Sequence, residues 1–391
     1  MIYKIKDLAT VKRGASPRPI LDYLTSSGFK WLKISDFSFG DKYVFETKEF
    51  IKEEGVKKTR FVKKGTLILT NSGTPGIPIF LGEDMCLHDG FLYFENVNER
   101  VNLEFLFYWF QNYRNNIVNL ANGSDFKNLK KEIVENLEID LPDINEQNRI
   151  VNILSKIDSK ILNNVYLNKS IKNYIDCLFT KNFVDNENTL NFKEGIFSDL
   201  ISFSNGYSFD SKLMLDKEEK DTYKVFKMGN IMIGGGINKS KTKSWYKKDQ
   251  CKNIEKFIAQ KNDILMCMTD MKASENPLLG HTALIDKSDE FVINQRVGII
   301  RCKKEIYVTF VYTLTNYPSF ISEIRSRANS GVQVNLSTSG ICNTKVMIPS
   351  ESLIFKFYND TKELFYKQSS LFEQNEQLVL LKENILKKLF M

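Results

Sequence analysis

Two segments of the chain carry hydrophobic residues at the spacing of a coiled coil. In the first segment these residues recur at alternating intervals of four and three, which places them on one face of an α-helix. The positions of this first seam are Ile150, Leu154, Ile157, Ile161, Asn164, Asn168, Ile171, Ile175 and Leu178. The pattern predicts a helix over about residues 150–178, roughly 40 Å long at about 1.5 Å per residue.

The second segment lies near the C-terminal end of the sequence and has the same kind of spacing. Its main seam positions are Leu364, Leu371, Asn375, Leu378 and Ile385. When the two segments are superposed by their ends, Asn164 falls on Asn375. Polar residues in a seam cost stability but fix its register, so we expect these asparagines to pair across the two helices. The other interpretation is a solvated helix pair that carries asparagine by chance, because the chain is rich in this residue.

The remaining sequence alternates short apolar runs with polar turns, and it repeats once at a long period. The matching stretches are 31–37 with 225–231, 61–69 with 258–266, and 121–142 with 328–349. We therefore predict an α+β protein with two mixed α/β globular modules, each followed by a long helix. The predicted boundaries are 1–142 for the first module, 143–182 for the first helix, 183–349 for the second module and 350–391 for the second helix.

The connection after the first helix, residues 181–192, is short. An antiparallel helix pair needs this segment only to turn the chain. A parallel pair would need it to run back along nearly the whole helix, close to the limit of roughly 3.3 Å per residue. We therefore predict an antiparallel coiled coil with a pseudo-two-fold internal repeat. Modules about 40 Å apart would suit DNA half-sites one helical turn apart, roughly 34–36 Å.

Charge is distributed unevenly between the predicted parts. The whole chain has 55 Lys and Arg against 48 Asp and Glu, a formal net charge of +7. Residues 1–142 hold 20 basic and 19 acidic side chains, residues 190–349 hold 23 and 17, and the two helical segments hold six of each. Neutral helices with apolar seams suit protein contacts. The basic excess of the globular modules suits contacts with phosphate.

Most enzyme signatures are missing from the sequence. It contains no Gly-Lys step and hence no P-loop, no G-x-G-x-x-G, no G-x-S-x-G and no Pro-Pro dipeptide of the amino-methyltransferase type. Its six cysteines are scattered, and its only histidines are His88 and His281, so neither a metal cluster nor a disulfide framework is indicated. We expect a non-catalytic protein without cofactor or metal. The start of the sequence lacks the apolar core of a signal peptide, and we expect a cytoplasmic location.

Residues 141–150, Leu-Pro-Asp-Ile-Asn-Glu-Gln-Asn-Arg-Ile, follow Asn122-Gly123-Ser124 and Asn128-Leu129. This stretch resembles the end of a target recognition domain and the start of the conserved helix in DNA specificity subunits of type I restriction-modification systems. The resemblance implies two target recognition domains, two spacer helices packed as an antiparallel coiled coil, and no catalytic activity. It also implies double-stranded DNA as a partner, together with two methyltransferase subunits and, through them, restriction subunits. The second copy, residues 349–354, lacks the Glu-Gln step, so the two docking sites need not be equivalent.

Candidate DNA-binding residues lie in polar, glycine-containing loops and in basic clusters. Asn, Ser and Thr in such loops can meet base edges or phosphates, and Arg can bind guanine or phosphate through two hydrogen bonds. Residues 70–73 form one such loop, and we take residues 269–272 as its counterpart in the second module. The candidates are Lys12, Arg13, Arg18, Asn71, Ser72, Ser124 and Lys127 in the first module, and Tyr207, Lys239, Lys241, Lys243, Lys272, Arg296, Arg325, Arg327 and Gln333 in the second. The other interpretation of these loops is ordinary solvated turns.

His88 aligns with Asn294 in the repeat and is expected to be a structural residue. The divergence between the two modules favours an asymmetric, bipartite DNA target, since identical readers would favour a palindrome. The sequence thus predicts a DNA specificity subunit that recruits methyltransferase and restriction subunits. The alternative is a coiled-coil adapter that binds protein surfaces without sequence-specific DNA binding.

Overall fold

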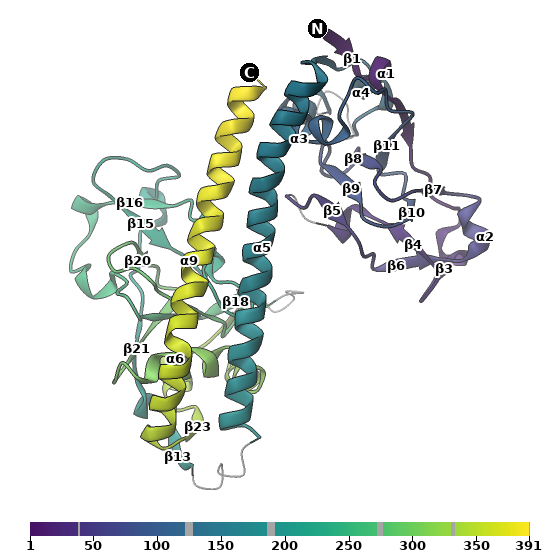
Figure 1. Cartoon of the computed structure of the whole chain (residues 1–391). Coiled ribbons are helices and arrows are strands. Elements are labelled where there is room, and N and C mark those ends of the chain that lie inside the picture. The colour runs from purple at the N-terminus through teal and green to yellow at the C-terminus, as the bar shows by residue number, and fades with distance from the viewer. Residues whose placement is uncertain (38–39, 122–127, 186–191, 272–276, 330–332, 391) are drawn as a thin grey trace. The chain divides into compact units, whose positions relative to one another are not determined.

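The computed structural model describes residues 1–37, 40–121, 128–185, 192–271, 277–329 and 333–390 (Figure 1). The chain divides into two compact units. The first comprises Met1–Ile161 and Gln377–Met391, and the second comprises Leu162–Glu376. Each unit therefore contains one globular module and a stretch of both long helices.

The first module is built on two five-stranded sheets. One has the strand order β2 (Thr10–Arg13), β11 (Phe91–Glu95), β8 (Leu67–Thr70), β9 (Pro78–Leu81) and β5 (Tyr43–Val44). The other has the order β3 (Leu24–Thr25), β6 (Glu49–Ile51), β4 (Phe29–Leu32), β10 (Met85–Leu87) and β7 (Arg60–Val62). A further pair joins β1 (Ile2–Lys4) to β12 (Glu138–Asp140), and the helices are α1 (Ile5–Leu8), α2 (Glu53–Val56), α3 (Leu103–Ala121) and α4 (Lys131–Glu135).

Strand β8 explains why the first module has two layers of core. Its residues are all buried, and successive side chains point to opposite faces of the sheet. Leu67 and Leu69 pack in the cluster that includes α3, whereas Ile68 packs with Leu87 of β10 between the two sheets. A strand covered on both faces reads as a continuous apolar run, as this one does.

The second module repeats this plan with fewer strands. Its main sheet has the order β14 (Ile201–Asn205), β21 (Val297–Cys302), β17 (Ile264–Cys267) and β19 (Thr282–Leu284), and a second sheet has the order β16 (Trp245–Lys247), β15 (Thr222–Phe226) and β20 (Val292–Ile293). Two strand pairs complete it, β13 (Lys193–Ile196) with β23 (Lys345–Ile348) and β18 (Thr269–Met271) with β22 (Gln333–Asn335). The helices are α6 (Tyr307–Thr315), α7 (Pro318–Ser326) and α8 (Thr338–Cys342).

The topology confirms the internal repeat. The order β2-β11-β8-β9 in the first module matches β14-β21-β17-β19 in the second. The parallel pair of β4 with β10 matches the parallel pair of β15 with β20. Helices α4 and α8 have the same length and lie at the offset that the sequence repeat gives.

The two long helices, α5 (Ile144–Phe183) and α9 (Glu351–Leu389), are antiparallel, as predicted. In the second unit Asn164 Nδ2 donates to Asn375 Oδ1 at 2.9 Å and Gln368 Nε2 donates to the Asn168 carbonyl at 3.2 Å, so rising numbers on α5 meet falling numbers on α9 (Figure 1). In the first unit Lys382 Nζ of α9 binds Asp158 Oδ1 of α5 at 2.6 Å. This contact again pairs a lower residue number on α5 with a higher one on α9, as an antiparallel pair requires.

Helix α5 begins six residues before the first seam position because Asp143 caps it. Asp143 Oδ1 accepts hydrogen bonds from the amides of Asn145 and Glu146 at 2.9 and 3.0 Å. The structure buries Ile150, Leu154, Ile157, Asn164, Asn168, Ile171, Ile175 and Leu371, and it half-buries Ile161, Leu178, Leu364, Asn375, Leu378 and Ile385. No described helix combines the length and hydropathy needed to span a lipid bilayer.

Candidate nucleic-acid interface

In both modules a three-residue loop leaves the second sheet and lies against a glycine that ends a strand of the main sheet. In the first module the loop is residues 88–90 and the glycine is Gly14, whose amide donates to the Phe91 carbonyl at 2.9 Å. In the second module the loop is residues 294–296 and the glycine is Gly206, whose amide donates to the Val297 carbonyl at 3.0 Å.

Only glycine fits at these two positions. A Cβ atom on Gly14 would lie 2.1 Å from the His88 carbonyl oxygen, and one on Gly206 would lie 2.3 Å from the Asn294 carbonyl oxygen. Backbone-to-backbone approach is thus built into each module at the same place, and it fixes each loop on its sheet.

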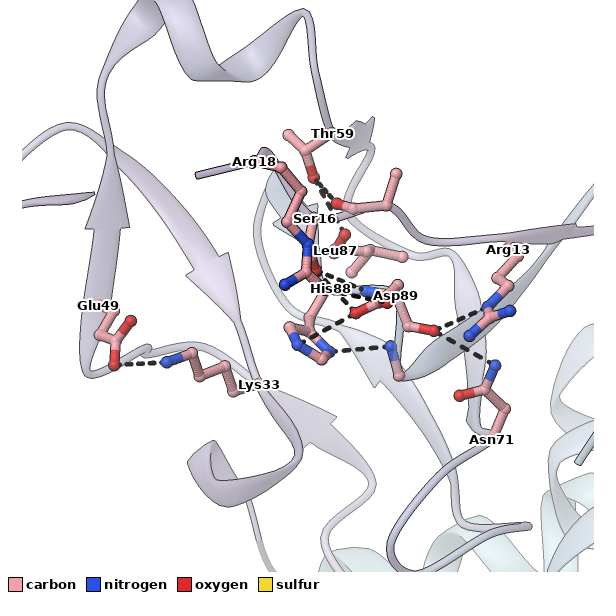
Figure 2. A network of polar contacts seen from close by, with 12 residues as sticks. Arg13, Ser16, Arg18, Lys33, Glu49, Thr59, Asn71, Leu87, His88 and Asp89 are labelled. Atoms are coloured by element: carbon pink, nitrogen blue, oxygen red, sulfur yellow. Dashed lines mark hydrogen bonds and ion pairs between the residues drawn. The ribbon is translucent and has the colours of Figure 1, made fainter. Parts of the chain in front are cut away.

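Asp89 lies at the centre of a polar network in the first loop (Figure 2). Its Oδ1 accepts from Ser16 Oγ at 2.7 Å and lies 3.1 Å from His88 Nε2. Its carbonyl oxygen accepts from Arg13 Nε at 3.0 Å and from Asn71 Nδ2 at 3.3 Å. Residues from two other parts of the chain, the segment 13–16 and Asn71, therefore hold this loop in place.

The surroundings of Asp89 and His88 in this loop lower the pKa values of both side chains. Burial acts to raise the pKa of Asp89, but the hydrogen bond from Ser16 and the charges of His88, Arg13 and Arg18 outweigh it, and the pKa is lowered. Burial lowers the pKa of His88, against the attraction of Asp89. At neutral pH the network therefore holds a carboxylate acceptor and a neutral imidazole, whose Nδ1 accepts from the Gly90 amide at 2.9 Å.

The second loop holds different side chains on the same backbone plan. Asn294 Oδ1 accepts from the Arg296 amide at 3.2 Å, and the Gln295 amide donates to the Tyr207 carbonyl at 2.8 Å. The side chains of Gln295 and Arg296 are exposed. This loop offers an amide and a guanidinium where the first loop offers a carboxylate and Gly90.

The first-module candidates are only partly brought together. Arg13, Arg18 and Asn71 contact the loop of residues 88–90, and Ser72 approaches Gly90. Lys12 instead pairs with Glu95 at 2.6 Å. The candidates Ser124 and Lys127 lie outside the described residues.

Among the second-module candidates, Tyr207 and Arg296 lie at the loop of residues 294–296, whereas three cations are engaged elsewhere. Lys239 is half-buried between Glu290 at 2.7 Å and Asp286 at 3.5 Å, Arg325 binds the carbonyls of Leu279 and Pro277 at 2.9 and 2.8 Å, and Arg327 binds Glu323 at 2.7 Å. The first two hold the module together and are not free for a ligand. Lys241, Lys243 and Gln333 are exposed, and Lys272 lies outside the described residues.

The family of the chain follows from its match to a known domain. The type I restriction modification DNA specificity domain matches residues 1–173 and again residues 190–358. The chain belongs to this family. Both copies of the internal repeat are thus copies of the DNA specificity domain, and each copy contains one of the two loops described above.

Related members of the DNA specificity family cover nearly the whole chain. The MjaIX specificity subunit of a type I restriction enzyme from Methanocaldococcus jannaschii is 23% identical over 410 residues, 98% of this chain and 90% of that protein. The MjaVIII specificity subunit from the same organism is 23% identical over 367 residues, 89% of this chain and 82% of that protein. The crystal structure of the type I restriction-modification S subunit from M. genitalium shares the fold, with a TM-score of 0.61, 18% identity, and coverage of 100% of this chain and 96% of that chain.

The sequence did not lead us to Ser16, Asp89 or Gln295. The sequence predicts a structural role for His88 from its alignment with Asn294, and that alignment marks the equivalent loops of the two DNA specificity domains. The hydrogen bonds also correct the register of a neighbouring loop. The Asn71 amide binds the Gly90 carbonyl and the Met268 amide binds the Arg296 carbonyl, so Asn71 corresponds to Met268 and residues 269–272 are shifted from the expected match with 70–73.

Proposed function

We propose that this chain is the DNA specificity subunit of a type I restriction-modification complex. Residues 1–142 and 183–349 would be its target recognition domains, and residues 143–182 and 350–391 its spacer helices. The observation that carries the proposal is the pair of equivalent loops, residues 88–90 and 294–296, which share a backbone plan but differ in every side chain. Such a pair suits two readers of different DNA sequences, and hence a bipartite, asymmetric target.

The partners of this subunit would be double-stranded DNA, two methyltransferase subunits and, through them, restriction subunits in the cytoplasm. The names of the related specificity subunits support this assignment. The chain itself would recognise DNA without catalysing a reaction.

Methylome sequencing of cells that carry this subunit and its methyltransferase partner tests the proposal. We expect one new methylated motif with two unlike parts separated by a fixed spacer. An active complex that produces no such motif would contradict DNA reading. The coiled-coil adapter would then remain, and it predicts no DNA binding by the purified complex at any salt concentration.

Docking of the partner can be tested on the helices. Replacing Ile157 and Ile161 by Asp places carboxylates on the seam of α5, where Ile157 is buried and Ile161 half-buried. A buried charge without a partner is strongly destabilising, so we expect the helices to separate and the methyltransferase to be lost. The control is Lys160→Asp, an exposed position on the same helix. Co-purification of the methyltransferase with the double variant at the wild-type level would count against docking on the helix pair.

A further inference from the structure

The two carboxylate oxygens of Asp89 have different surroundings. Oδ1 is held by Ser16 and His88, as described above. Oδ2 makes an ion pair with Arg18 Nη2 at 4.0 Å, which is too long for a hydrogen bond. The side chain is 34% exposed. One oxygen is therefore fixed to the protein while the other retains its capacity to accept a hydrogen bond (Figure 2).

A carboxylate would normally be repelled by the phosphates of DNA, but two arginines flank this one. Arg13 Nε binds the Asp89 carbonyl, and the Arg18 side chain is 76% exposed. Their charges outnumber that of Asp89. The cluster as a whole can therefore lie against the phosphate backbone while its carboxylate faces the bases.

The backbone under Asp89 is rigidly supported. Thr59 Oγ1 donates to the carbonyl oxygens of Ala15 and Leu87 at 2.6 and 3.0 Å, which ties the segment after Gly14 to the end of β10. Asn71, which is buried, donates to the Asp89 carbonyl from the other side. A side chain that reads a base gains affinity and discrimination when its position is fixed before binding.

Resting on the proposed DNA-reading role, we propose that Asp89 determines specificity in the first half-site: its Oδ2 accepts a hydrogen bond from the exocyclic amino group of a cytosine or adenine in the major groove. Cytosine N4 and adenine N6 are the amino donors exposed there, and an ionised carboxylate, which has no proton to donate, matches them. The acceptor edges of guanine and thymine, O6, N7 and O4, would repel it. The lowered pKa of Asp89 agrees with this role, because the group stays ionised at neutral pH.

The second module offers an internal comparison. Gln295 occupies the position that corresponds to Asp89, and its exposed amide can both donate and accept. A glutamine pairs with adenine through two hydrogen bonds. The two modules would thus present different hydrogen-bonding groups to the bases from the same place in the fold.

The test removes single amino groups from the bases of the DNA. Methylome sequencing first defines the motif, and if it yields none, the proposed function itself has failed. Duplexes are then made in which each cytosine of the first half-site is replaced by 2-pyrimidinone and each adenine by purine, which lack the amino group. Binding is measured for the complex of subunit and methyltransferase, with the wild-type subunit and with Asp89→Ala and Asp89→Asn.

We expect one analogue position to weaken wild-type binding by about five- to 150-fold, the range of a good base contact. The same analogue should weaken binding of Asp89→Ala less than twofold, because this variant has no carboxylate that could accept a hydrogen bond from the amino group. A pyrimidinone effect identifies cytosine and a purine effect identifies adenine. Gln295→Ala is the matched control and should keep the full wild-type effect in the first half-site.

Two results would overturn the proposal. One is that every analogue weakens the wild type and Asp89→Ala equally. The other is that both Asp89 variants keep the wild-type thermal midpoint but bind no DNA at all, because the loss of one base contact cannot abolish binding and Asp89 would then only position its neighbours. Asp89→Asn preserves the shape of the side chain, so it keeps the comparison possible if Asp89→Ala unfolds.

Discussion

Gly14 is in contact with the loop of residues 88–90 through backbone atoms alone. Its replacement by Ala would place Cβ 2.1 Å from the His88 carbonyl oxygen, so the loop must move. We expect Gly14→Ala to lower the free energy of unfolding by roughly 1–3 kcal/mol, the usual cost of overpacking. Chemical denaturation measures this change. The control is Gly229→Ala, whose Cβ would have no neighbour within 4 Å; equal stability of the two variants would refute the close approach.

Glu376 on α9 has a carboxyl group whose pKa lies above its ordinary value of 4.5. Burial is the main cause, and Glu290 and Asp286 add to it, while Lys239 and Lys224 oppose it. The folded protein therefore holds this proton more tightly than the unfolded chain does. The stabilisation that this gives is complete below about pH 4.5 and is lost as the pH rises through the folded pKa.

We therefore expect Glu376→Gln to remove this loss, so that the free energy of unfolding falls less steeply with pH above 4.5 than in the wild type. Denaturation across a series of pH values measures the slope. Glu373 is the matched control, because a hydrogen bond from Lys287 at 2.5 Å lowers its pKa. Its stabilisation is present above the ordinary pKa and lost as the pH falls, so Glu373→Gln should lower stability at neutral pH. Parallel pH profiles for the two variants would contradict the assignment.

At the scale of the helix pair, two neighbouring asparagines of α5 have opposite energetic roles. Asn164 donates to Asn375, whereas the side-chain Nδ2 and Oδ1 of Asn168 are buried without a hydrogen-bond partner among the described residues. Burying an unsatisfied polar group costs about 1–3 kcal/mol. We expect Asn168→Leu to stabilise the protein by a similar amount.

Asn164→Leu should instead destabilise the helix pair by about 0.5–1.5 kcal/mol, because it removes a hydrogen bond that is made. Denaturation of both variants gives the comparison. The interpretation fails if the two substitutions change stability in the same direction.

The seam was open to prediction because burial along a helix depends only on spacing within one segment. The internal repeat was visible for a related reason, since matching stretches keep their order. The loop of residues 88–90 could not be predicted from the sequence, because its contacts join Ser16, Asn71 and Asp89, which are far apart in the chain. Asp89 taken alone resembles a solvated turn residue. The ion pairs of Lys12 and Lys239 join residues that are distant in the sequence, so the charge of these two lysines alone does not reveal that they are engaged within the protein.

At the scale of the whole molecule, DNA affinity should depend on the exposed cations of the second module. Lys241 and Lys243 are exposed, whereas Lys239 is paired with Glu290 and Asp286. Each phosphate contact that is lost should reduce the slope of log K against log salt by about 0.9. We expect Lys241→Ala and Lys243→Ala each to lower the slope in binding titrations from about 50 to 200 mM salt.

Lys239→Met is the control for this measurement. It should leave the slope unchanged while lowering the thermal midpoint, because it deprives Glu290 and Asp286 of their cation. An equal change of slope for all three lysines would show that Lys239 reaches the DNA after all.

The first unit contains residues from two distant parts of the chain, because Leu386 of α9 lies in the same core as Ile150 and Leu154. The second unit is one continuous stretch, Leu162–Glu376. On the ribosome, domains usually mature in the order in which they emerge. We expect that order to be reversed here: the part of the first core that Leu386 fills stays open until residues after Glu376 have left the exit tunnel, so the second unit can be complete before the first.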